Sequence, residues 1–193
     1  MATATSKSLG ALLLLVAAFA LASCGGGGGG PSRPSELAFV HPTSVPAGWS
    51  VAQLPSRIAT MAYPGTWRRI TSDPGTVSAA QVDARGVIVG YLNATPRQAN
   101  ESLRNWATFR PRHNAQEGDR DVRVLHDTTG VPVGSGRGSC VEDTYRTVRA
   151  HYHEVACLVD GQRASTVMVA AATTTAWPRM AGELHRAIAA FRT

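Results

Sequence analysis

The sequence predicts an α+β fold: an antiparallel β-sheet with a capped mid-chain helix and a C-terminal helix packed on it. Two observations lead to this prediction. In the last third of the chain, three apolar segments are separated by short turns, a spacing typical of an antiparallel meander. Two other segments place apolar side chains at helical spacing. We expect a single globular domain over residues 37–193, preceded by two segments of different composition.

Residues 1–23 have the composition of a lipoprotein signal peptide. Lys7 is the only charged residue before the apolar core from Leu9 to Leu21, and small residues follow at the expected cleavage site. The core is shorter than the roughly 20 apolar residues that span a bilayer. Leu-Ala-Ser-Cys, ending at Cys24, resembles the bacterial lipobox, in which the cysteine thiol receives a diacylglyceryl group. Cys24 is the predicted lipidation site; the alternative is an ordinary secretory signal with a chance cysteine.

Residues 24–36 would form a lipidated Gly/Pro/Ser linker. Six glycines, Gly25 to Gly30, are followed by Pro, Ser and Arg, and such a segment behaves as a flexible coil. Two acyl chains on one cysteine anchor a protein stably to a membrane. We therefore expect a lipid-anchored protein on the extracytoplasmic face of the cell membrane, with an envelope protein, lipid or glycolipid as its partner.

The chain is basic, with 19 Lys and Arg against 13 Asp and Glu, yet this does not indicate nucleic-acid binding. Every Lys or Arg after Lys7 is an arginine, and the arginines are scattered singly among acidic residues. Nucleic-acid binding would favour a dense basic stretch interleaved with aromatic residues. We expect no nucleic-acid partner, and mild attraction to anionic lipid headgroups is the alternative.

In chain order, residues 37–49 are expected to be an irregular lead-in, followed by a strand over Ile58–Tyr63. Thr76–Val82 and Val87–Leu92 flank a segment of turn composition and predict a hairpin. A helix is then expected to begin at Thr95 as its N-cap, with Pro96 in the first turn and Gln98 completing a capping box. Its core face is predicted to contain four residues, Ala99, Leu103, Trp106 and Ala107, and Pro111 is expected to end it at residue 109 or 110.

Residues 122–126 show a weaker strand pattern, and the glycine-spaced segment 133–138 is interpreted as a flexible connection. That segment lacks the ending of a P-loop and the context of a dinucleotide fingerprint, so no cofactor is predicted. Three strands are expected over residues 139–146, 152–159 and 163–171, with Asp160-Gly161 as a hairpin turn. An apolar stripe at helical spacing predicts a C-terminal helix lying on the sheet: Trp177, Met180, Ala181, Leu184, Ile188 and Phe191.

Once Cys24 is assigned to lipid, Cys140 and Cys157 remain, in a compartment where disulfides persist. If they face each other across a hairpin, Tyr145 lies opposite Tyr152 and the turn centres on residues 148–149. The same register places Asp143 opposite Glu154, a like-charge pair that is unfavourable unless an arginine lies between them. We predict a disulfide, with a free-thiol pair or a metal site as the alternative.

Catalytic motifs are not evident in this sequence. His151 and His153 alternate on a strand and could hold zinc, but no third ligand is placed by spacing. In the cysteine register they lie opposite Arg146 and Thr144, neither of which favours metal binding. A Gly-x-Ser-x-Gly elbow is missing too. We expect no catalytic residues and no bound metal, and the histidines are interpreted as surface residues near a turn.

The order of elements resembles the PsbP-like sandwich found in a group of actinobacterial cell-envelope lipoproteins. Tyr-Pro-Gly-Thr-Trp at residues 63–67 and Ala-Ala-Phe at residues 189–191 are the local features of this resemblance, which covers residues 58–193. It implies a non-enzymatic binding or adaptor protein and offers no catalytic motif. Two other hypotheses are an envelope hydrolase, metal-assisted through His151 and His153, and a structural lipoprotein without a dedicated ligand.

Overall fold

The structure is a computed structural model that describes residues 37, 41–98 and 100–193. The predicted signal peptide, the linker and Cys24 lie outside the described residues, so these assignments stay predictions. Among the helices of the described part, none has the length and apolar character needed to cross a membrane.

A seven-stranded antiparallel sheet forms the centre of the fold, with the strand order β3-β4-β5-β9-β8-β7-β6. A separate antiparallel hairpin pairs β1 with β2. The strands of the large sheet are β3 (Arg68–Ile70), β4 (Val77–Val82), β5 (Ile88–Pro96), β6 (Arg120–Val133), β7 (Gly136–Arg146), β8 (His151–Asp160) and β9 (Ser165–Thr173). Those of the hairpin are β1 (Trp49–Gln53) and β2 (Thr60–Pro64).

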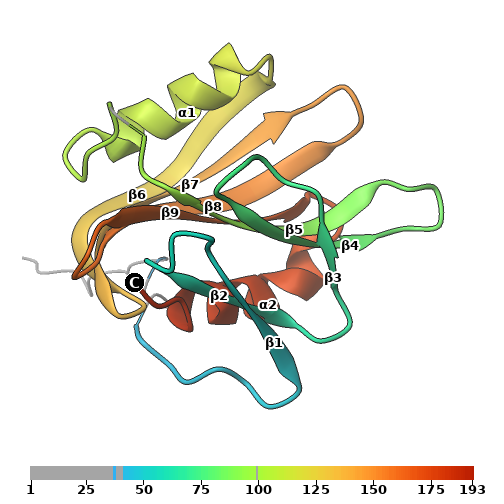
Figure 1. The fold of residues 1–193 in the computed structure, drawn as a ribbon. Coiled ribbons are helices and arrows are strands. Elements are labelled where there is room, and N and C mark those ends of the chain that lie inside the picture. The colour runs from blue at the N-terminus through green and yellow to red at the C-terminus, as the bar shows by residue number, and fades with distance from the viewer. Residues whose placement is uncertain (1–36, 38–40, 99) are drawn as a thin grey trace, which may run out of the picture. The chain divides into compact units, whose positions relative to one another are not determined.

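Helices cover both faces of the sheet (Figure 1). Helix α2 (Trp177–Ala189) and the β1–β2 hairpin pack on one face, and helix α1 (Trp106–Gln116) packs on the other. Because successive side chains of a strand point to opposite faces, β8 contributes to two cores. Val155, Cys157 and Val159 belong to the cluster on the α2 side, whereas Ala156 and Leu158 join Trp106 on the α1 side. The α+β sandwich predicted from the sequence is confirmed.

The register of the β7–β8 hairpin is the predicted one. Cys140 lies opposite Cys157, and Tyr145 lies opposite Tyr152. The turn falls at residues 147–150, where the hydroxyl oxygen of Thr147 accepts hydrogen bonds from the backbone N–H groups of Arg149 and Ala150. The hairpin over β4 and β5 and the C-terminal helix on the sheet are likewise confirmed.

The prediction of a capped helix from Thr95 is wrong at both ends of the helix. Thr95 and Pro96 continue β5 and pair with β9, and the helix begins only at Trp106. A capping-box pattern is local, and here pairing of β5 with a strand about 70 residues away in sequence overrides it. Pro111 lies inside α1, which continues to Gln116. The proline has no N–H to donate to the carbonyl of Ala107, so one helical hydrogen bond is missing. Trp106 still holds the helix on the sheet, because it is buried and its indole N–H donates to the carbonyl of Ala156 at 2.8 Å.

Residues 133–138 are not a flexible connection. They turn β6 directly into β7, with Val133 paired to Gly136, and the later glycines lie within β7. A Cβ at Gly138 would lie 2.7 Å from the carbonyl oxygen of Leu158, so close strand packing requires glycine there. The prediction of an irregular segment over residues 37–49 is also wrong near its end, because β1 begins at Trp49. Neither β1 nor β3 was predicted.

Candidate functional site

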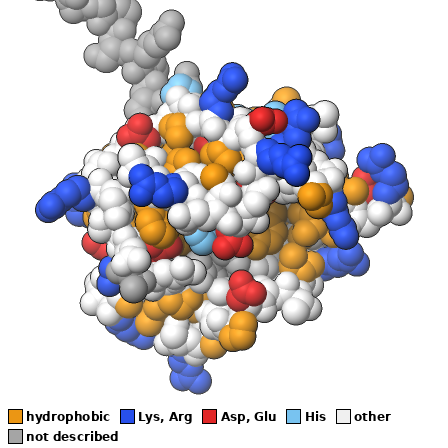
Figure 2. Space-filling view, turned by 90° about the horizontal axis from the view of Figure 1, so that it is seen from above, with side chains coloured by type: hydrophobic (Ala, Val, Ile, Leu, Met, Phe, Trp, Pro, Cys, Tyr) orange, Lys and Arg blue, Asp and Glu red, His pale blue; other side chains and the backbone are white. Residues whose placement is uncertain are grey.

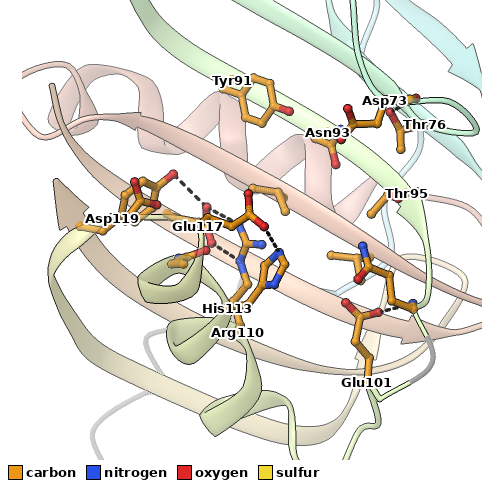
Figure 3. Close-up of a pocket in the computed structure, with 16 residues that line it drawn as sticks. Asp73, Thr76, Tyr91, Asn93, Thr95, Glu101, Arg110, His113, Glu117 and Asp119 are labelled. Carbon is orange, nitrogen blue, oxygen red and sulfur yellow. Dashed lines mark hydrogen bonds and ion pairs between the residues drawn. The ribbon is translucent and has the colours of Figure 1, made fainter. Parts of the chain in front are cut away.

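A polar pocket opens on the α1 side of the sheet. Helix α1 lies over β6 and β7, and beside it the surface of β5 and β9 remains accessible. The cavity has a volume of about 310 Å³. Figure 3 shows side chains of α1 on one side of it and those of β5 on the other. The lining residues are Asp73, Thr76, Tyr91, Asn93, Thr95, Gln98, Glu101, Arg110, His113, Asn114, Glu117, Asp119, Tyr145, Glu154, Val167 and Val169.

A buried ion pair between Arg110 of α1 and Glu154 of β8 forms the inner wall of this polar pocket. Arg110 Nε donates to Glu154 Oε1 at 2.7 Å, and Nη2 donates to Oε2 at 2.9 Å. The hydroxyl of Tyr145 donates to the same carboxylate at 3.1 Å. Burial alone would lower the pKa of Arg110, but the carboxylate of Glu154 outweighs it and holds the pKa above its ordinary value. Arg110 therefore keeps its charge, and its two-point bonding to Glu154 fixes α1 against the sheet.

Asp143 lies directly opposite Glu154, as the cysteine register predicts. The arginine that this like-charge pair needs is Arg110, which comes from α1 rather than from the hairpin itself. Burial, followed by the charge of Glu154, raises the pKa of Asp143 to about 8. Asn114 donates to Asp143 Oδ2 at 3.4 Å, and Oδ1 has no hydrogen-bond partner within the described part of the chain. A protonated Asp143 removes the like-charge repulsion.

Further carboxylates line the polar pocket. Glu101 accepts a hydrogen bond from the backbone N–H of Gln98 at 2.7 Å, and burial raises its pKa. Burial and then the charge of Glu154 raise the pKa of Asp119. Asp73 reaches the polar pocket from the segment between β3 and β4. Acidic groups therefore outnumber basic ones in this lining, although the chain as a whole carries a net charge of +6.

Those predicted site residues that the structure describes lie away from this pocket. Cys140 and Cys157 form a disulfide on the α2 side of the sheet, where both are buried in the core. His153 also faces that side: its ring stacks on Trp177 with centroids 3.8 Å apart, and its Nε2 lies 2.6 Å from Glu142 Oε1. His153 is therefore a packed residue of the α2 side rather than a surface residue.

His151 is exposed at the start of β8, opposite Arg146, as predicted. In the part of the chain that the structure describes, no group of three or more His, Cys, Asp or Glu side chains could hold a metal ion. The metal-assisted hydrolase hypothesis therefore finds no third ligand for His151 and His153 among those residues.

Sequence reasoning did not find the polar pocket. Its lining is collected from the β3–β4 segment, β5, α1, β7, β8 and β9. His113 and Glu117 are four positions apart and form a pair, but the charged pair that forms the inner wall has no such spacing. Arg110 and Glu154 are 44 positions apart. The one available signal was the predicted Asp143–Glu154 pair, which called for an arginine without indicating which one.

Comparison with known proteins gives information on the fold only. No protein-family model matches the sequence. A search of curated proteins finds no match either. Among solved structures, the chain is similar to a protein of Bacteroides thetaiotaomicron, with a TM-score of 0.47, 12% identity and coverage of 76% of this chain. It spans only 48% of that protein's length.

Two further solved structures are similar over most of their length. LpqN of Mycobacterium tuberculosis, described as involved in cell envelope biogenesis, has a TM-score of 0.43 and 12% identity, with 84% of this chain and 98% of LpqN covered. CyanoP, the cyanobacterial PsbP of Synechocystis, has a TM-score of 0.52 and 14% identity, with 77% of this chain and 94% of CyanoP covered. The likeness to CyanoP and the layers described above establish that this chain has a PsbP-like α+β fold.

Proposed function

We propose that the protein is a lipid-anchored, extracytoplasmic binding lipoprotein of the bacterial cell envelope, and that the polar pocket beside α1 holds a small hydrophilic ligand. The observation that carries the binding part is the pocket itself. It is concave, its lining is mainly polar, and its inner wall is fixed by the Arg110–Glu154 pair. Small-molecule sites are usually preformed cavities with polar groups at set positions.

The adaptor role expected from the sequence is compatible with such a pocket, because a bound ligand can alter how the domain presents itself to an envelope partner. Catalysis has less support. The buried carboxylate of Glu154 is neutralised by Arg110, and the disulfide withdraws both domain cysteines from nucleophilic chemistry.

The anchor is tested by detergent phase partition of the protein produced in a bacterium that lipidates such signals. The wild-type chain should enter the detergent phase, and Cys24→Ser should stay in the aqueous phase, because only the cysteine thiol accepts the diacylglyceryl group. Equal partition of the two proteins would show that the lipobox assignment is wrong.

Ligand binding is tested with two matched substitutions. Thr95→Phe places a ring in the polar pocket, and Thr108→Phe makes the same change on an exposed position of α1 outside it. Each protein is purified from the envelope of the source bacterium and denatured, and the released small molecules are compared by mass spectrometry. We expect wild type and Thr108→Phe to release one compound in nearly equal amounts. Thr95→Phe should not release it. Identical extracts from all three would refute the binding function.

A further inference from the structure

A second pocket adjoins the polar pocket. We call it the tyrosine pocket; it has a volume of about 370 Å³ and is lined by Ile70, Ile88, Tyr91, Tyr145, Thr147, Tyr152 and Ala171. Tyr91 and Tyr145 line both pockets, so the two spaces adjoin at these two residues. A ligand that fills both must therefore combine two chemically different parts.

The tyrosine pocket offers mainly ring and aliphatic surface, because the protein itself engages the hydroxyl groups. Tyr152 donates to the carbonyl of Ile88 at 2.8 Å, Tyr145 donates to Glu154, and the hydroxyl of Tyr91 lies 3.3 Å from that of Ser78. The rings of Tyr145 and Tyr152 stack with centroids 5.8 Å apart. These bonds fix the ring orientations, so the surface is ready for an apolar group.

The polar pocket, which shares Tyr91 and Tyr145 with the tyrosine pocket, is lined by carboxylates. Among residues 41–98 and 100–193, no arginine forms an ion pair with Asp73 or Asp119, and the single guanidinium of the polar pocket is matched by Glu154. After burial, Glu154 and Asp73 raise the pKa of Tyr91, and Glu154 and Asp119 raise the pKa of Tyr145. Figure 2, a view from the α1 side, shows acidic side chains near the middle of this face and arginines mostly toward its edge.

We propose that the ligand is a small organic cation with an apolar stem: its ammonium group lies among the carboxylates of the polar pocket, and its stem lies against Tyr91 and Tyr145 in the tyrosine pocket. This inference rests on the proposed binding function. The face of a tyrosine ring attracts cations and also packs against apolar groups. Both the ammonium group and the stem of the ligand can therefore make favourable contacts with the same two rings. An anionic ligand would instead meet uncompensated carboxylates.

The charge requirement is tested with three probes that share one stem: hexylammonium, hexanol and hexanoate. Their affinities for the purified protein are measured by calorimetry at neutral pH and low salt. We expect hexylammonium to bind about tenfold more tightly than hexanol, since cation–π and carboxylate contacts together contribute at least that factor, and hexanoate not to bind. Added salt should weaken the binding of hexylammonium but not that of hexanol.

The position of the probe is tested with substitutions. Asp119→Asn should weaken hexylammonium binding about fivefold, and the control Asp127→Asn, on an exposed position of β6, should leave it unchanged. Tyr91→Leu should weaken it by a similar factor, whereas Tyr91→Phe keeps the ring and the affinity. Thr95→Phe should abolish binding, and Thr108→Phe should not.

The outcomes separate this inference from the proposed function. If hexanol or hexanoate binds as tightly as hexylammonium, if hexylammonium does not bind, or if Asp119→Asn has no effect, the cationic ligand is wrong. A neutral or anionic compound released from wild type but not from Thr95→Phe would also overturn it, and would leave the binding function standing. Identical envelope extracts from all variants would refute the binding function itself.

Discussion

The buried carboxyl of Asp143 makes the stability of this protein depend on pH. Burial and the neighbouring Glu154 raise its pKa in the folded protein to about 8, from its ordinary value of 3.8 in the unfolded chain. Between these two values the folded chain holds a proton that the unfolded chain has released. The contribution of Asp143 to the free energy of unfolding must therefore fall as pH rises through this window, by at most about 1.4 kcal/mol per pH unit.

Asp143→Asn tests this reasoning, because asparagine mimics the protonated acid in shape and remains uncharged at every pH. From pH 5 to pH 7 the wild-type protein should lose up to about 2.7 kcal/mol more stability than the variant, and the variant should be the more stable protein at pH 7. Urea unfolding at several pH values, with the disulfide intact, measures both slopes. Burial lowers the pKa of His185, which gives an opposite slope, but this contribution is present in both proteins and cancels in the difference.

Asp127→Asn is the matched control, since it removes an exposed carboxylate from the same sheet. Its slope should follow that of wild type. Equal slopes for wild type and Asp143→Asn, or a wild-type stability that rises relative to the variant between pH 5 and pH 7, would show that Asp143 is ionised in the folded protein. The like-charge repulsion at Asp143 would then remain in the folded protein.

Three other substitutions test the fold. Cys157→Ser opens the disulfide and should lower the free energy of unfolding by about 3 kcal/mol. The thiol of Cys140 should then react under denaturing conditions without prior reduction, whereas a thiol that reacts in the denatured, unreduced wild-type protein would contradict the disulfide. Arg110→Ala leaves Glu154 buried without its charged partner and should lower the free energy of unfolding in urea by about 3–5 kcal/mol. Adding Glu154→Gln should restore part of this stability. A decrease below about 1 kcal/mol would argue against the buried pair. Gly138→Ala forces a Cβ against the carbonyl of Leu158 and should lower stability by roughly 1–3 kcal/mol, seen as a lower melting temperature, whereas an unchanged value would mean that β7 and β8 lie further apart.

Local and neighbouring interactions explain which elements were predictable. The β4–β5 and β7–β8 hairpins follow from alternating apolar residues and short turns, and a cysteine pair 17 positions apart defines the β7–β8 register to the residue. The C-terminal helix follows from its apolar stripe. Each of these signals lies within one hairpin or one helix, so the sequence contains all of the partners.

The errors arise where distant pairing competes with a local pattern. Thr95 and Pro96 have the composition of a helix start, but hydrogen bonds to β9 hold them in a strand. The glycines of residues 133–138 suggest flexibility, yet they are required because neighbouring backbone and side chains pass too close for a Cβ. Strand β1 pairs with β2 and contributes Ala52 to the core cluster that contains α2, a location that no local pattern indicates.

The sequence by itself therefore determined the α+β class, the main hairpins, the C-terminal helix and the pairing of Cys140 with Cys157. Only the tertiary structure decided where α1 begins, which arginine meets Glu154, and that a polar pocket and a tyrosine pocket adjoin at Tyr91 and Tyr145. The physical reason is distance along the chain. Strand register and helix periodicity depend on neighbours. The polar pocket, in contrast, is assembled from elements whose side chains meet only after β5 has paired with β9 and α1 has packed on the sheet, and the tyrosine pocket joins residues of β3, β5, β7, β8 and β9.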